Sequence, residues 1–345
     1  MMWYESLAYR GLIPDILMRA VIRFKLGKYE DYIGNLSENS LRQIKSEFIS
    51  LASQGPIAIE TQAANSQHYE FPTVFYSSIL GPTLKYSGSL WNSDEKNIET
   101  ADLETLEIYT SRAQIQNGQS VLDIGCGWGS LSLYVGKKFN DCKVTAITNS
   151  TTQQEYLNSQ IRKHNLVNVS VNKVNINDFQ TTHKYDRALS IEMFEHTRNT
   201  KLLMENIDGW LNDKGKLFIQ VFSHSTYPQF FDNYSDSWMS RNFFSGGMMP
   251  YSGFHQEIAK CLNLVEIWEE SGINYHKSLE AWLNNLDYSK KKLIESLEIP
   301  DQSTSPKMAI NKFRIFLLFC SELFNHNQGM SRKIMNYLFT KQETR

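Results

Sequence analysis

The stretch Val121-Leu122-Asp123-Ile124-Gly125-Cys126-Gly127-Trp128-Gly129 runs from an apolar strand pattern into a glycine-rich turn, and a helical pattern over residues 130–139 follows it. Glycines suit such a turn because a backbone without side chains lets a ligand approach the strand end and the helix N-terminus closely. A single glycine can serve a tight turn alone, but three in this context indicate a ligand site. The spacing is GxGxG, whereas the dinucleotide-binding turn has GxGxxG.

From residue 120 onward, short β-rich runs alternate with helical segments. The predicted strands cover residues 121–124, 143–147, 169–174, 186–191, 216–222, 264–268 and 334–340, and helical patterns cover 252–261, 279–297 and 306–324. This alternation predicts a parallel, doubly wound α/β sheet. Residues 223–250 are rich in aromatic, Ser, Asn and Gly residues, and we expect them to form an insertion along a pocket wall.

The chain is expected to fold as three closely packed parts. Residues 1–100 have helical patterns and predict a helical cap. Residues 101–222 hold the cofactor-binding core. Residues 223–345 supply insertions around the substrate pocket, lid helices and the closing strands of the core.

One helix of the predicted cap follows Pro14 and carries Arg19, Arg23 and Lys25 on one side. We interpret this basic side as the solvated face of a helix that packs within the chain. Contact with an anionic membrane surface is the alternative interpretation.

The composition excludes several classes of protein. Of the 345 residues, 41% are apolar and 21% are charged, which is typical of a globular protein. The formal net charge of −2 provides no basic field for nucleic acid. Apolar runs are far shorter than the roughly 20 residues of a membrane span, so we expect no stable membrane insertion and a cytoplasmic location. The four cysteines show no metal-ligand spacing, so no metal site is expected.

The residues after the second predicted strand argue against a nicotinamide cofactor. A dinucleotide enzyme carries an acidic residue there, which binds the ribose hydroxyls. This chain instead has Ile147, Thr148, Asn149 and Ser150, followed by Gln153. The DxGxGxG turn resembles motif I of class I S-adenosylmethionine-dependent methyltransferases.

Further motifs extend this resemblance over nearly the whole chain. The segments Leu84–Ser87, Asn149–Gln153, Ser190–His196 and Phe243–Pro250 resemble the cyclopropane fatty acid synthase superfamily, and within it the coclaurine N-methyltransferase branch. The resemblance implies a Rossmann-like fold with a seven-stranded, mostly parallel sheet and an antiparallel last strand. It also implies S-adenosylmethionine as cofactor and S-adenosylhomocysteine as product.

The resemblance assigns cofactor-binding residues by position in these motifs. They are Tyr86, Ser87, Asp123, Gly125, Gly127, Asn149, Gln153, Asn175 and Ile176. Asn175 stands where family members often have an aspartate beside the adenine, and an amide oxygen can accept the same hydrogen bond.

Two chemistries occur in the superfamily, and the residues favour methylation of an amine. The lipid-cyclopropanating members hold a bicarbonate with a cysteine, a glutamate, a histidine and a tyrosine. In this chain Gly88 stands in place of the cysteine and Gln220 in place of the histidine, while Glu195 and Tyr275 remain. A lipid synthase acting on unsaturated acyl chains stays as the alternative, and a cofactor-binding protein that has lost catalysis is a second one.

The EMFEH segment follows the fourth predicted strand, at the edge where doubly wound sheets place ligands. By resemblance, Glu195 and His196 bind the amine and accept its proton, with Glu192 as a nearby partner. A carboxylate orients a cationic amine, and a histidine titrates near neutral pH. The structural alternative, strongest for Glu192, is that a carboxylate caps the helix that begins near Asn199 or binds backbone amides.

Aromatic residues are expected to line the substrate pocket, because aromatic faces attract cations and pack against flat rings. The candidates are Tyr69, Phe243, Phe244, Phe313 and Phe316. Ordinary core packing is the alternative for each. The expected partner is a small-molecule amine, and a homodimer is left open.

Overall fold

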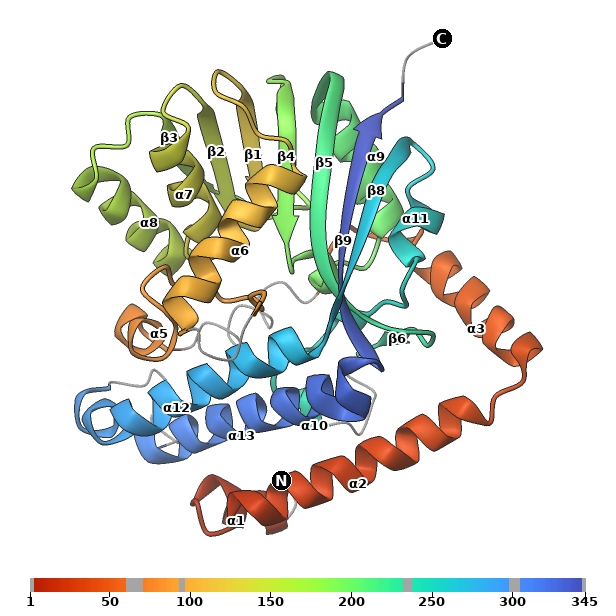
Figure 1. The fold of residues 1–345 in the computed structure, drawn as a ribbon, viewed down its shortest axis with the longest axis vertical. Coiled ribbons are helices and arrows are strands. Elements are labelled where there is room, and N and C mark those ends of the chain that lie inside the picture. The colour runs from red at the N-terminus through yellow and green to blue at the C-terminus, as the bar shows by residue number, and fades with distance from the viewer. Residues whose placement is uncertain (1–2, 60–70, 93–96, 232–237, 298–304, 343–345) are drawn as a thin grey trace.

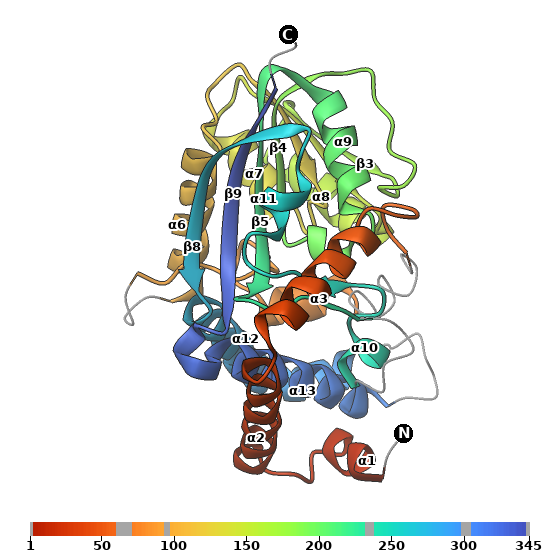
Figure 2. The ribbon, with the colours of Figure 1, turned by 90° about the vertical axis from the view of Figure 1, so that its right-hand side faces the viewer.

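The computed structural model describes residues 3–59, 71–92, 97–231, 238–297 and 305–342 (Figures 1 and 2). Its centre is a seven-stranded sheet with the order β3-β2-β1-β4-β5-β9-β8. The strands are β1 (Ser120–Ile124), β2 (Lys143–Thr148), β3 (Val169–Lys173), β4 (Tyr185–Ile191), β5 (Leu211–His224), β8 (Leu262–Ser271) and β9 (Arg332–Lys341). The five strands from β3 to β5 are parallel, and β9 runs antiparallel to both β5 and β8. The predicted strands and fold class are confirmed.

Helices cover both faces of the sheet because apolar side chains alternate along its strands. Val121 packs with α6 (Ile98–Arg112) and α7 (Ser130–Lys138), whereas its neighbour Leu122 packs with α9 (Thr200–Trp210). The helix α8 (Thr151–Lys163) buries Leu157 against Val171 of β3.

A helical layer lies beyond the carboxyl ends of the parallel strands (Figure 1). It contains the antiparallel pair α12 (Ile273–Ser296) and α13 (Pro306–Asn325), with α5 (Thr73–Ile79) beside α12. Their apolar side chains form a second core, separate from the core around the sheet.

The remaining elements are short or belong to the N-terminal part. They are α1 (Trp3–Tyr9), α2 (Asp15–Gly34), α3 (Glu38–Leu51), α10 (Trp238–Asn242), α11 (Phe254–Ile258), η1 (Phe194–His196), η2 (His326–Gly329), β6 (Gln229–Phe230) and β7 (Met248–Met249). The helix predicted over 252–261 is shorter than expected, because Gly253 has a positive φ of 96° and β8 already begins at residue 262. No helix within the described ranges has the length and apolarity to cross a membrane.

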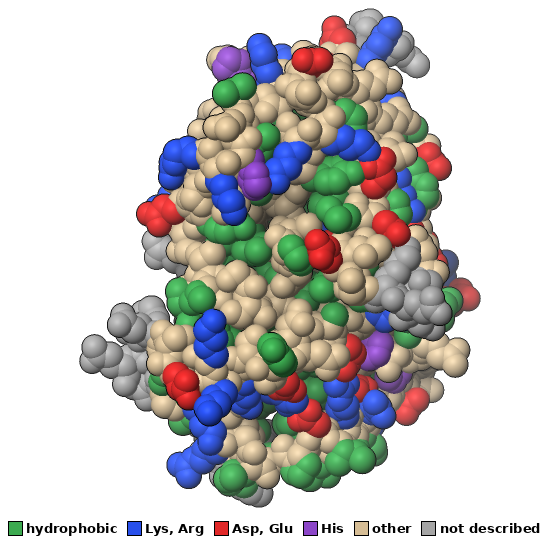
Figure 3. All heavy atoms as spheres, turned by 60° about the vertical axis from the view of Figure 1, so that its left-hand side comes forward, with side chains coloured by type: hydrophobic (Ala, Val, Ile, Leu, Met, Phe, Trp, Pro, Cys, Tyr) green, Lys and Arg blue, Asp and Glu red, His purple; other side chains and the backbone are tan. Residues whose placement is uncertain are grey.

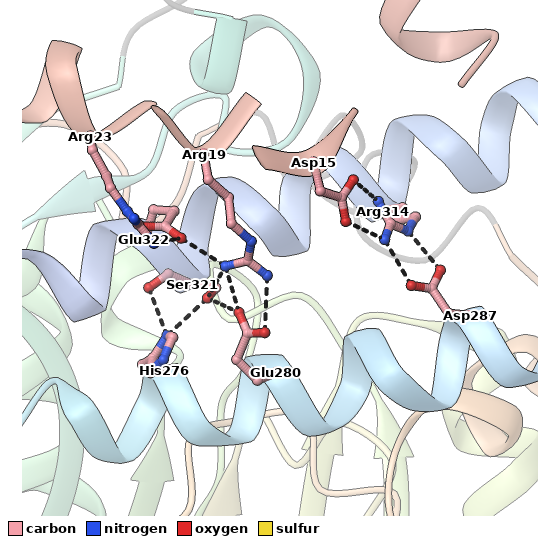
Figure 4. Close-up of polar contacts among 9 residues, drawn as sticks. All are labelled: Asp15, Arg19, Arg23, His276, Glu280, Asp287, Arg314, Ser321 and Glu322. Carbon is pink, nitrogen blue, oxygen red and sulfur yellow. Dashed lines mark hydrogen bonds and ion pairs between the residues drawn. The ribbon is translucent and has the colours of Figure 1, made fainter. Parts of the chain in front are cut away.

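The predicted helix after Pro14 is confirmed as α2, and its basic residues differ in exposure: Arg23 and Lys25 face solvent as expected, whereas the Arg19 side chain is only 20% exposed. Arg19 binds Glu280 of α12 and Glu322 of α13, and Arg23 binds the same Glu322 (Figure 4). Apolar side chains of α2 are exposed as well, and 81% of the surface of Ile16 is accessible. The ion pairs of Arg19 and Arg23 hold α2 against the α12–α13 pair. Hydrophobic side chains are visible on the surface at the end of the molecule where α1 and α2 lie (Figure 3).

Candidate active site

Two adjoining pockets lie between the carboxyl ends of β1 and β4 and the α12–α13 pair. The first is lined by the glycine-rich turn, and the second is a largely apolar cavity of about 330 Å³. Tyr86 and Glu192 line both pockets. A reaction between a molecule in each would therefore take place beside these two residues.

The glycine-rich turn has the geometry that its sequence predicts. Gly125 has a φ of 73°, and a Cβ there would lie 2.5 Å from Cγ of Met193. Gly127 has a φ of 54° and open space where its Cβ would be. A side chain would therefore be strained at both positions and would occupy room for a ligand at Gly127.

Asp123 lies beneath this turn, with 3% of its surface exposed, and lines the first pocket. Its Oδ2 accepts a hydrogen bond from Ser132 Oγ at 2.5 Å. Burial raises the pKa of Asp123 to about 6, although the bonds from Ser132 lower it. A cationic group of a ligand would favour the ionised carboxylate.

Gln153 offers an unused donor in the same pocket. Its Oε1 accepts from Thr148 Oγ1 at 2.6 Å, while its buried Nε2 has no partner among the described residues. A buried amide is expected to find a partner, so a ligand with acceptor oxygens fits there. Ser87 lines the pocket as well, as the sequence predicts.

The structure places the other predicted cofactor residues at the same edge of the sheet but outside the pocket lining. Asn149 directly follows β2, and Asn175 and Ile176 come shortly after β3. Asn175 Oδ1 accepts the backbone N–H of Asn177 at 3.0 Å, and Ile176 packs against the core.

The carboxylate of Glu192 is held by three donors. Oε1 accepts from the Gly88 backbone N–H at 3.1 Å and from Gln220 Nε2 at 3.0 Å, and Oε2 accepts from the Tyr275 hydroxyl at 2.7 Å. The residue itself has a φ of 50°, which is uncommon for a residue with a side chain. The pKa of Glu192 is raised above its usual value, because burial raises it more than nearby Lys85 and these hydrogen bonds lower it.

Glu192 does not cap the next helix. The N-terminus of α9 is capped by Asn199, whose Oδ1 accepts the backbone N–H of Leu202 at 3.0 Å. The capping alternative for Glu192 is therefore wrong, whereas the alternative that this carboxylate binds a backbone amide agrees with its hydrogen bond from the Gly88 N–H.

The structure separates the other two residues of the EMFEH segment. Glu195 is fully buried, and its Oε1 accepts the Phe222 backbone N–H at 2.7 Å. Burial and the charge of Glu192 raise its pKa well above the usual range. His196 instead lines the cavity together with Glu192. Burial lowers the pKa of His196 to about 4, so its ring is neutral at neutral pH.

Two of the predicted aromatic residues, Phe244 and Phe316, line the cavity. The ring of Phe244 lies 4.8 Å from that of His196. Phe243 and Phe313 are buried in the core behind, where Phe243 stacks on Phe316 at 4.4 Å. The predicted residue Tyr69 lies outside the described residues.

Sequence reasoning missed several residues of the cavity wall. They are Tyr29 of α2, Leu279 and Trp282 of α12, and Arg332 at the start of β9. His224, which the sequence offers as a substitute for the histidine of the cyclopropanating pattern, lies at the end of β5 and also lines the cavity. His224 and Arg332 are paired in the register of β5 and β9. A prediction that these two strands are neighbours could therefore have placed the two residues side by side.

Gly88 distinguishes this site from the lipid-cyclopropanating pattern. A Cβ at this position would lie 2.8 Å from Cγ of Tyr275, whose ring fills the space. A cysteine in place of Gly88 would require Tyr275 to move away from Glu192. Within the described ranges, no group of three or more His, Cys, Asp or Glu side chains could hold a metal ion.

Comparison with known proteins places this geometry in a family. The model of the family described as mycolic acid cyclopropane synthetase matches residues 58–332. The (S)-coclaurine N-methyltransferase of Thalictrum flavum subsp. glaucum is 34% identical over 96% of this chain and 93% of its own. That of Papaver somniferum is 31% identical over 96% and 95%.

A solved structure agrees with these relatives over the whole fold. It is the crystal structure of coclaurine N-methyltransferase bound to N-methylheliamine and SAH, with a TM-score of 0.92 and 30% identity over 98% of this chain and 99% of that one. The chain belongs to the mycolic acid cyclopropane synthetase family, in the branch of the coclaurine N-methyltransferases.

Proposed function

We propose that this chain transfers the methyl group of S-adenosylmethionine to the nitrogen of a small-molecule amine with an aromatic ring. The observation that carries the proposal is that Glu192 lines both pockets while His196 lines the cavity next to it. The residues of the first pocket fit the cofactor, because Asp123 can face its cationic part and the unused Nε2 of Gln153 can donate to its oxygens. When bound, the cofactor supplies an activated methyl group.

We assign the role of cation binding to Glu192. Three donors fix the direction of its carboxylate, so the remaining lone pairs can face an amine that gains positive charge. A fixed charge acts strongly in a largely apolar cavity, where water competes less. Tyr86 would line the passage through which the methyl group moves from one pocket to the other.

We assign proton acceptance to His196. A neutral imidazole can take the proton that the nitrogen loses as the new C–N bond forms. Glu195 lies behind both groups, and its contact with the Phe222 backbone supports the shape of the site. The aromatic walls formed by Phe244 and Phe316 would hold a flat ring.

The decisive experiment measures release of S-adenosylhomocysteine with a panel of arylalkyl amines and, separately, with vesicles of unsaturated phospholipid, each with and without bicarbonate. Turnover on amines without bicarbonate is expected. Turnover on vesicles alone, dependent on bicarbonate, would overturn the proposal and establish lipid cyclopropanation instead.

A further inference from the structure

Lys85 is a buried lysine close to the proposed amine site, and 1% of its surface is exposed. Its Nζ donates to the backbone oxygen of Ser87 at 3.0 Å, to Ser87 Oγ at 2.9 Å and to the backbone oxygen of Gly88 at 2.7 Å. An ammonium group has three donors, and all three are used within one turn of the chain. Such complete hydrogen bonding is what allows a buried cation to persist.

The same turn holds Glu192. The Gly88 backbone N–H donates to Glu192 Oε1 at 3.1 Å, while the ring of Tyr275 occupies the space where a Cβ of Gly88 would lie. The Tyr275 hydroxyl donates to Glu192 Oε2 at 2.7 Å. Lys85 thus fixes the backbone of Gly88, which donates one hydrogen bond to Glu192. Gly88 in turn lies against Tyr275, which donates another.

Lys85 also carries a charge into a cluster of acids. Burial lowers the pKa of Lys85 to about 8, although the charges of Asp102 on α6 and of Glu192 raise it. Asp102 accepts hydroxyl hydrogen bonds from Ser89 at 2.6 Å and Thr83 at 2.7 Å.

Three acids interact electrostatically with Glu192, and they are Tyr109 of α6, Glu195 of η1 and Tyr275 of α12. His196 lines the same cavity, and burial lowers its pKa to about 4, so its ring gains a charge only near that pH. Burial and a second carboxylate favour the neutral form of Glu192. Among these described groups, Lys85 is the cation that opposes this tendency.

We propose that Lys85 is a positioning residue for Glu192, which holds the Tyr86–Gly88 turn and keeps the Glu192 carboxylate ionised, so that the cavity presents an anion to a cationic amine. This inference rests on the proposed function of the cavity. A lysine that only stabilised the turn would affect folding, but it would not change the pH at which the cavity loses affinity for cations.

The test uses benzyltrimethylammonium, a permanent cation without a titratable proton, and calorimetry of the full chain with S-adenosylhomocysteine present. Because the probe does not titrate, the pH dependence of its Kd reports on the protein. Affinity should fall as the pH drops and Glu192 takes up a proton. In Lys85→Gln the loss of the cation should move the midpoint upward by about one pH unit, which makes binding about threefold weaker halfway between the two midpoints and about tenfold weaker well below both.

Three further variants separate electrostatics from folding. Lys85→Arg keeps the charge and should keep the native midpoint, and this variant still tests the inference if Lys85→Gln does not fold. Lys138→Gln, at an exposed ion pair with Glu107, is the matched control and should leave the midpoint unchanged. In a Glu192→Gln background, adding Lys85→Gln should weaken the probe no further.

The outcomes are distinguishable. An unchanged midpoint in Lys85→Gln, a shifted midpoint in Lys85→Arg, or an equal loss of affinity from Lys85→Gln with and without Glu192 would each overturn the role of Lys85. Failure of the native protein to bind the probe at any pH would instead overturn the proposed amine site.

Discussion

At the scale of single residues, Glu192 and His196 differ from Glu195 in what they face. The first two line the cavity, whereas Glu195 is fully buried against the backbone of Phe222. Because a charge acts on a substrate only when the two approach closely, the three residues should respond differently to substitution.

Glu192→Gln should lower kcat/KM for the amine about 100-fold, because the neutral amide no longer balances the charge that develops on nitrogen. Steady-state kinetics measure this loss, and the affinity for S-adenosylhomocysteine should change little. Glu195→Gln is the matched control. An equal loss in both variants, with both still folded, would mean that Glu192 has no special place in the reaction.

The pH profile tests His196. Burial lowers the pKa of His196 to about 4, so the ring that accepts a proton is present at neutral pH and is lost only as the pH falls through about 4. We therefore expect no acid limb near pH 6.5 from this residue. His196→Ala should lower kcat about 100-fold at pH 7. A native profile with an acid limb near 6.5 that disappears in His196→Ala would contradict a ring that is neutral at neutral pH.

Gly88 tests the packing that separates this site from the cyclopropanating pattern. Gly88→Ala places a Cβ 2.8 Å from the Tyr275 ring, and such overpacking costs about 1–3 kcal/mol. The melting temperature and kcat should both fall, because Tyr275 must move away from Glu192. Gly209→Ala is the control, because a Cβ at Gly209 would have open space around it, and its melting temperature and kcat should not fall. Gly118 does not serve as a control because it has a positive φ.

Much of the site could be predicted at this scale because its residues occur in short motifs. The glycine-rich turn, Gln153 and the EMFEH segment all reach the pockets or their walls. The role of Lys85 could not be predicted, because it depends on the charges of Glu192 and Asp102, which lie far from Lys85 in the sequence. It was likewise not predictable that Glu192 and not Glu195 lines the cavity, because Glu192 has an uncommon backbone conformation with a φ of 50°.

At the scale of elements, α2 shows how an ionic contact can position a pocket wall. It contributes Lys25, Leu26 and Tyr29 to the cavity, and the buried Glu322 of α13 binds both Arg19 and Arg23. Helical periodicity predicts that residues 15–34 form a helix, but it does not say which stripe is buried. Because Glu322 is 299 or more residues away from these arginines, the docking side of α2 was not predictable.

Glu322→Gln should loosen α2, since hydrogen bonds to charged groups contribute about 1.5–3 kcal/mol. Hydrogen exchange along α2 should quicken and KM for the amine should rise several-fold, while sheet amides remain protected. High salt should have a similar, weaker effect, because the Arg23 side chain is 60% exposed. Glu47→Gln, on an exposed face of α3, is the control. Unchanged exchange in α2 would show that other contacts hold this helix.

At the scale of the whole molecule, one cluster joins three distant parts of the chain at the cavity. Glu30 of α2 accepts from Nη1 of Arg332 on β9 and from Nε2 of His224 on β5, the latter at 3.3 Å. The backbone N–H groups of Thr226 and Tyr227 donate to Nδ1 of His224, so the neutral ring carries its proton on Nε2 and donates to Glu30. The doubly wound sheet was predictable from strand alternation, but the contact of α2 with β9 and β5 through Glu30 was not.

The stability of this closure should depend on pH in a defined direction. Burial raises the pKa of Glu30, but His224 and Arg332 lower it to about 2 overall. A carboxylate with a lowered pKa stabilises the fold above its unfolded value near 4.5, and the contribution is lost as the pH falls towards 2. At pH 7 Glu30→Gln should therefore reduce the free energy of unfolding by about 3 kcal/mol.

Chemical denaturation of the native protein and Glu30→Gln between pH 7 and pH 3 measures this contribution. The difference between the two proteins should be largest at pH 7 and shrink below about 4.5, since a protonated Glu30 resembles the amide. Asp31→Asn, at the exposed neighbouring position on α2, should show no such convergence. A difference that stayed constant over the whole range would mean that packing, and not the charge of Glu30, joins α2 to β5 and β9.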